Sequence, residues 1–238
     1  MSPPKRAVIF VTSATAPLHD GNPTGLFISE AQHPYQVLTK AGFEVDLVSE
    51  TGTYTEDWLS MQDSFLNGSD KEEYEDKNSV FRKKLDNMPD VSSIDGKKYG
   101  LFFASAGHAA LIDYPHAKGL HKIASDIWNA GGVAAAVCHG PAIFPGVIDA
   151  STGKSVIRGK VITGFTTQAE NDMHIMEPIR SWNEPLIDEW AKKLDATYTR
   201  AENVWGDFVV ADGRVVTGMN PQSAKSAAQA AVNAFEQL

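Results

Sequence analysis

Short apolar segments alternate with longer amphipathic segments along this chain, and this alternation limits the folds open to it. Residues 7–12, 99–104 and 133–137 are almost wholly apolar, which is typical of strands buried on both faces of a sheet. Helical patterns follow at 26–42, 115–130, 184–194 and 221–235, and further strands are predicted at 43–49 and 160–164. The pattern predicts an α/β protein with a mainly parallel sheet and helices on both faces.

We therefore predict a flavodoxin-like three-layer sandwich, formed as a single domain over residues 1–238. Three local features refine the prediction. Pro34 should kink or divide the helix over 26–42. The charged stretch at about 55–90 reads as a partly helical surface insertion. Asp212-Gly213 predicts a hairpin near the C-terminus.

The composition excludes several classes of function. Among 238 residues there are 21 Lys plus Arg against 30 Asp plus Glu, giving a formal net charge of −9. Proteins bind nucleic acid or anionic lipid through clustered basic charge. Because this chain is acidic overall, neither is an expected partner. One cysteine can form no internal disulfide. The apolar runs are too short to span a membrane and the N-terminus has no signal-peptide pattern, so we expect a soluble protein of the cytoplasm or nucleus.

The single cysteine, Cys138, stands where an all-apolar predicted strand ends. His139-Gly140-Pro141 follows and begins a new helical segment, which is the pattern of a nucleophile elbow. A helix N-terminus would lower the pKa of the thiol below its usual value. Backbone N–H groups of the loop around Gly107, with that of His139, could form an oxyanion hole. A lone cysteine is also commonly an inert buried residue, and Gly107 could simply permit a turn.

Several separated motifs resemble the DJ-1/PfpI superfamily, and within it the fungal heat-shock protein 31 branch of glutathione-independent, glyoxalase III type. They are the Cys138 elbow, Ser105-Ala106-Gly107-His108 and the segment from Glu30 to Pro34. The resemblance implies that Cys138 is the nucleophile and His139 its acid/base. It implies that Glu170 orients His139, and that Glu30 is a protonated carboxyl beside the sulfur. The oxyanion would be bound by Gly107, His108 and His139.

The same resemblance implies a chemistry of D-lactate dehydratase type in a stress-response protein. Methylglyoxal or glyoxal would form a hemithioacetal with the thiolate and leave as lactate or glycolate, with water as the other reactant. The net reaction needs no cofactor, and no metal is expected. The partners implied are a small dicarbonyl substrate, unfolded client proteins, and a second copy of the chain in a homodimer.

Other functions stay open at this level. The branch is associated with holdase chaperone activity, and a reactive thiol could serve as a redox sensor. A cysteine peptidase is a further alternative. A class I glutaminase is disfavoured because no His-x-Glu unit occurs. His108, His116 and His121 match no standard metal-ligand spacing, which indicates scattered surface histidines.

Overall fold

The predicted apolar strands pair into one six-stranded sheet in the computed structural model, which describes residues 2–238. Five strands are parallel, and the sixth lies antiparallel at one edge. If the five parallel strands are numbered along the chain, their order across the sheet is 2-1-3-4-5, which is the flavodoxin-like order. From one edge to the other, the strands are β4 (Glu44–Ser49), β1 (Arg6–Val11), β5 (Leu101–Ala104), β6 (Val133–Val137), β12 (Val215–Gly218) and β11 (Val209–Asp212).

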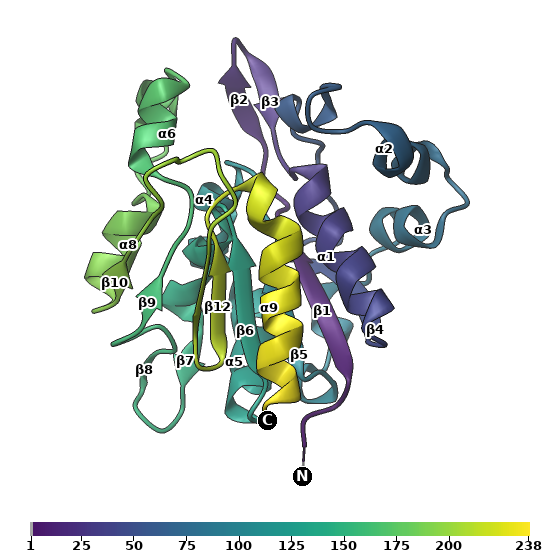
Figure 1. The fold of residues 1–238 in the computed structure, drawn as a ribbon, viewed down its shortest axis with the longest axis vertical. Helices are drawn as coiled ribbons and strands as arrows, with labels where there is room; N and C mark the ends of the chain where they lie inside the picture. The colour runs from purple at the N-terminus through teal and green to yellow at the C-terminus, as the bar shows by residue number, and fades with distance from the viewer. Residues whose placement is uncertain (1) are drawn as a thin grey trace.

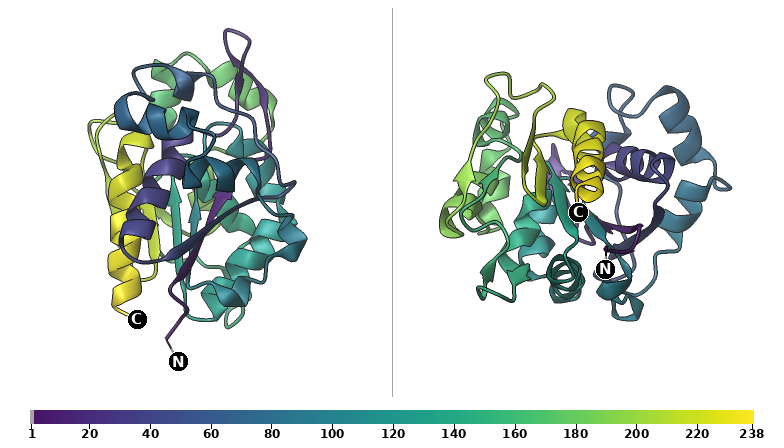
Figure 2. Two further views of the ribbon diagram at one scale, coloured as in Figure 1. Left: turned by 90° about the vertical axis from the view of Figure 1, so that its right-hand side faces the viewer. Right: turned by 60° about the horizontal axis from the view of Figure 1, so that its bottom comes forward.

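Helices cover both faces of this sheet and complete the predicted three layers. Figure 2 (left) shows α1 (Ile28–Lys40) and α9 (Ala224–Glu236) on one side and α5 (Lys118–Asn129) on the other. Alanines of α9 spaced three and four residues apart are buried, so this helix lies close to β6 and β12. The remaining helices are α2 (Gly68–Glu75), α3 (Val80–Asp86), α4 (Ala110–Asp113), α6 (Thr167–Asp172), α7 (Met176–Ser181) and α8 (Ile187–Lys193).

Two local predictions differ from the structure. Helix α1 runs unbroken through Pro34, so the proline does not divide it. The segment predicted as a strand at 160–164 forms only β9 (Val161–Ile162), which pairs with β10 (Thr197–Tyr198) outside the main sheet. Two more small antiparallel pairs are β2 (Ala16–His19) with β3 (Asn22–Thr24), and β7 (Ile148–Asp149) with β8 (Lys154–Ser155).

The segment over residues 55–90 carries α2, α3 and a short 3-10 turn, η1 (Leu59–Met61). It is tied to α1 by polar contacts. The Gln32 side chain donates to the Asp70 carbonyl at 2.9 Å, and His33 Nε2 lies 2.8 Å from Asp70 Oδ2. In Figure 1 this segment lies beside α1, at the end of the molecule where the parallel strands finish. Within residues 2–238, no helix combines the length and apolar character needed to cross a membrane.

The carboxyl ends of β5 and β6 meet at that end, and their loops approach each other closely. A Cβ added at Gly140, just after β6, would lie 2.3 Å from the carbonyl oxygen of Ala104, the last residue of β5. Any side chain here would push the two loops apart. The glycine therefore permits the close approach of the β5 and β6 loops.

We expect Gly140→Ala to lower the free energy of unfolding by about 1–3 kcal/mol because the added methyl overpacks a rigid backbone contact. Gly206→Ala is the matched control, since its nearest neighbour is a flexible Asn203 side chain at 3.3 Å, and its effect should stay within about 0.5 kcal/mol. Urea unfolding of the two variants measures the difference. Equal stabilities would contradict the proposed close approach.

Candidate active site

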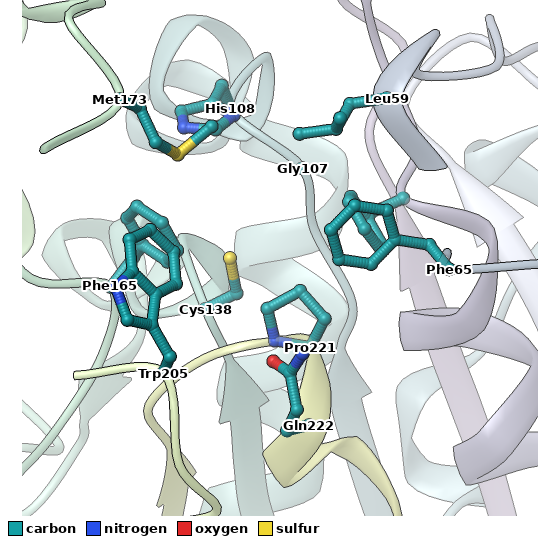
Figure 3. Close-up of a pocket in the computed structure, with 11 residues that line it drawn as sticks. Leu59, Phe65, Gly107, His108, Cys138, Phe165, Met173, Trp205, Pro221 and Gln222 are labelled. Carbon is teal, nitrogen blue, oxygen red and sulfur yellow. The ribbon is translucent and has the colours of Figure 1, made fainter. Parts of the chain in front are cut away.

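Cys138 stands at the tip of a sharp turn directly after β6. Its backbone has φ 59°, in the left-handed region that a non-glycine residue rarely adopts. Hydrogen bonds hold the turn on both sides: the Cys138 N–H donates to Gly218 O at 3.0 Å, and its carbonyl accepts from the Phe165 N–H at 2.8 Å. Figure 3 shows the sulfur directed into a pocket. This is the geometry expected of a nucleophile elbow.

The thiol begins a chain of three interacting side chains. Cys138 Sγ lies 3.3 Å from His139 Nδ1, and His139 Nε2 lies 2.7 Å from Glu170 Oε1. Glu170 is placed by the first turn of α6, where the Thr166 hydroxyl caps the helix by accepting from the Ala169 N–H. Because Glu170 faces Nε2, we assign the imidazole proton to Nε2, which leaves Nδ1 free to accept the thiol proton.

His108 contacts the other oxygen of the same carboxylate. Its Nε2 lies 3.1 Å from Glu170 Oε2, and its ring centroid is 4.4 Å from that of His139. From the sequence, His108 was predicted to be one of several scattered surface histidines that contributes only its backbone to the oxyanion site. The prediction of a surface histidine is wrong, because the side chain is buried. One sequence feature pointed to a shared site. His108 follows β5 and His139 follows β6, and these two strands pair side by side in the sheet.

The titrations of Glu170, His108 and His139 depend on one another. Burial raises the pKa of Glu170, but its interactions and hydrogen bonds with His108 and His139 outweigh this and lower it to about 2. Burial lowers the pKa of His108, yet the Glu170 charge and hydrogen bond raise it overall. Burial and the nearby His108 lower the pKa of His139. These opposite directions favour placing the proton on His108 rather than on His139.

Glu30 lies beside the sulfur from the first turn of α1 and is completely buried. Its Oε2 accepts from the Ala106 N–H at 3.1 Å, whereas Oε1 has no hydrogen-bond partner among residues 2–238. Burial raises the pKa of this carboxyl well above its usual range. A neutral Glu30 with its proton on Oε1 would be a hydrogen-bond donor beside Cys138.

The thiol itself does not have the lowered pKa that the sequence predicted. Burial is the largest cause that raises the pKa of Cys138 well above its usual value; an ionised Glu30 would raise it further, whereas a neutral Glu30 adds no such charge effect. The predicted helix after the elbow is the 3-10 segment η5 (Gly140–Gly146), which has too few aligned peptide dipoles to offset burial. An adjacent base can take the proton of a neutral thiol, and His139 Nδ1 lies 3.3 Å from the sulfur.

The loop after β5 presents backbone donors to the same region. Gly107 has φ 147°, and a Cβ there would lie 2.1 Å from the Gly25 carbonyl oxygen. The N–H groups of Gly107 and His108 donate to no other residue within 2–238. The His139 N–H is directed at the sulfur, where it favours the thiolate. These three groups are suited to holding an oxyanion formed next to Cys138.

A pocket with a volume of about 220 Å³ opens onto the sulfur. Its wall includes His108, and Phe165 packs against the rings of both His108 and His139 at 5.4 and 4.7 Å between centroids. The polar chain behind the thiol is thereby kept out of water, which strengthens its electrostatic interactions. The pocket gives a small molecule direct access to Cys138.

Two clusters have the composition of metal sites, but protein hydrogen bonds already use most of their ligand atoms. The first is His19, Asp57 and His108, and the second is His108, His139 and Glu170. Asp57 accepts from Thr24 Oγ1 and from three backbone N–H groups, and Glu170 is shared by the two histidines. The histidines His116 and His121 lie elsewhere, with Glu184 Oε1 at 2.6 Å and Tyr114 O at 2.7 Å respectively.

Comparison with known proteins places this site in a family. The chain is 47% identical over 217 residues to Glyoxalase 3 of Candida albicans, covering 91% of this chain and 92% of that protein. It is 44% identical to Glutathione-independent glyoxalase HSP31 of Saccharomyces cerevisiae, covering 98% of this chain and 99% of that protein. No family model matches the sequence.

Comparison with solved structures points to the same family. The crystal structure of glyoxalase III from Candida albicans superposes with a TM-score of 0.95 at 44% identity, covering 98% of both chains. Drosophila melanogaster DJ-1beta shares the fold with a TM-score of 0.55 at 15% identity, covering 100% of this chain and 94% of that one. The chain belongs to the family of glutathione-independent glyoxalases, and it shares its fold with DJ-1 and ThiJ/PfpI proteins.

Proposed function

We propose that this protein converts methylglyoxal or glyoxal, with water, to lactate or glycolate without glutathione or another cofactor. The observation that carries the proposal is the chain from Cys138 through His139 to Glu170, whose sulfur faces a small pocket. Relatives that share 43–47% of their residues with this chain are named glyoxalases, which supports the same reaction here.

The first step joins the thiol to the aldehyde. His139 Nδ1 takes the proton of Cys138 while the sulfur attacks the aldehyde carbon, and the C=O electron pair moves onto oxygen. The backbone N–H groups of Gly107, His108 and His139 hold this oxyanion. His139 then returns the proton to the oxygen, which gives a neutral hemithioacetal and restores the neutral imidazole.

The second step moves hydrogen between the two carbonyl carbons. Neutral His139 removes the proton from the former aldehyde carbon, and Glu30 gives its proton to the ketone oxygen, which forms an enediol. His139 then returns its proton to the former ketone carbon, while Glu30 takes the hydroxyl proton from the first carbon. The product is a thioester, and its hydrolysis releases the hydroxy acid and the free thiol.

The pairing of Glu170 with His108 serves this sequence of proton transfers. A carboxylate facing His139 alone would favour its protonated form, which cannot accept a proton from the thiol or the carbon. With His108 carrying the compensating positive charge, His139 stays neutral at rest. We therefore propose that His108 is a positioning residue that acts through Glu170.

The remaining predictions concern the setting of this activity. The pocket is small, which favours a dicarbonyl over the extended chain that a cysteine peptidase binds. A homodimer, a cytoplasmic or nuclear location, a role in the stress response, holdase binding of unfolded clients and redox sensing by Cys138 all stay predictions.

We expect Cys138→Ala to reduce lactate formation from methylglyoxal by at least about a thousandfold, because no other group can form the hemithioacetal. The assay omits glutathione and measures lactate directly. Unchanged thermal unfolding would show that the fold is intact. Lactate formation at the parental rate would rule out the cysteine mechanism.

Glu30→Gln should lower kcat by about a hundredfold to ten-thousandfold, since an amide can donate a hydrogen bond but cannot exchange a proton. The thiol should stay reachable, so iodoacetamide should still alkylate Cys138 and its rate reports that the pocket is intact. A parental kcat in this variant would exclude Glu30 from the proton transfers.

His108→Gln keeps a donor toward Glu170 but removes the positive charge. Because that charge lowers the pKa of His139, the pKa should rise in the variant. Activity needs neutral His139, so the acid limb of kcat/KM should move to higher pH. The matched control is His116→Gln, whose histidine contacts Glu184 away from the pocket and should leave the profile in place. An unmoved acid limb in His108→Gln would contradict the charge balance.

A further inference from the structure

Most of the pocket wall has no part in the proposed proton transfers. Apart from His108, Cys138 and Gln222, its lining consists of apolar side chains and one glycine. The large apolar members come from four separate parts of the chain and are Phe27, Leu59, Phe65, Phe165, Met173 and Trp205. Such a wall offers a polar three-carbon dicarbonyl few hydrogen-bond partners beyond the reacting end.

These side chains stand on both sides of the sulfur. Figure 3 shows Phe165, Met173 and Trp205 on one side of Cys138 and Leu59 and Phe65 on the other. The rings of Phe165 and Trp205 meet edge to face with 6.3 Å between centroids, and Phe65 meets Phe27 in the same way at 5.2 Å. The space between them is thus bordered by rigid aromatic surfaces, which favour a flat apolar guest.

The volume also exceeds what the smallest substrates need. The pocket measures about 220 Å³, whereas an apolar cavity of roughly 150 Å³ suffices to hold benzene. Methylglyoxal has only one methyl group to place against this wall. A phenyl ring attached to the same two carbonyl carbons would fill the remaining space and displace water from apolar surface.

Resting on the proposed glyoxalase activity, we propose that the preferred substrates are 2-oxoaldehydes whose second carbonyl carries an aromatic or bulky alkyl group. The two carbonyl groups take the positions beside Cys138 and Glu30, and the apolar group lies between Trp205 and Phe65. The chemistry is unchanged: phenylglyoxal and water give mandelate, with hydrogen moving from the aldehyde carbon to the ketone carbon and no external oxidant or reductant.

The test compares phenylglyoxal with methylglyoxal on the full-length protein. We expect kcat/KM to be about tenfold or more higher for phenylglyoxal, mainly through a lower KM, because a hydrophobic pocket discriminates by about tenfold or more for even small apolar groups. Mandelate and lactate are quantified directly. Cys138→Ala provides the background, including any loss of phenylglyoxal to arginine side chains.

Trp205→Ala should lower the ratio of the two kcat/KM values by about tenfold, because it removes one wall of the apolar space. Trp58→Ala is the matched control, since Trp58 is similarly exposed (39% against 45%) but does not line the pocket, and the ratio should not change. A ratio above one that falls in Trp205→Ala supports the inference. A ratio of one or less, or a high ratio insensitive to Trp205, overturns it. Turnover of neither substrate would instead refute the proposed function.

Discussion

The site depends on one carboxylate that is shared by two histidines. Glu170 holds His139 with one oxygen at 2.7 Å and His108 with the other at 3.1 Å, and all three side chains are buried. An unpaired charge at this depth would be costly, so the carboxylate needs a positive partner. In our proposal His108 supplies this charge, which leaves His139 neutral and able to accept a proton from Cys138. The proposed base therefore depends on a residue that need not contact substrate.

The fold brings these groups together from distant parts of the sequence. His139 follows β6 and His108 follows the adjacent strand β5, while Glu170 lies in the first turn of α6 and Glu30 in the first turn of α1. Carboxyl ends of parallel strands meet at one edge of a sheet, which is where such folds place their sites. The 3-10 turn η1 and the residues after it then contribute Leu59 and Phe65 to the pocket wall. The central sheet and its helices thus position the reacting groups, and the segment over 55–90 forms part of the pocket wall next to them.

Periodicity and apolar runs were sufficient to predict the central sheet, because strands buried on both faces leave a strong local signal in the sequence. The elbow was also readable, since Cys138 ends such a run. The role of Glu170 and Glu30 came only from the family resemblance, as isolated carboxylates on helices carry no local signal of burial. The raised pKa values of Cys138 and His108 could not be predicted, because both depend on burial and on interactions between residues 32 to 108 positions apart.

The most direct test of the central claim is the protonation of the two histidines in the resting protein at neutral pH. Nitrogen-15 NMR of the ring nitrogens, with signals assigned by His108→Gln and His139→Gln variants, reports each state separately. The charge balance predicts a doubly protonated His108 and a neutral His139 whose proton is on Nε2. A doubly protonated His139 beside a neutral His108 would contradict it, because the group facing the thiol could then accept no proton.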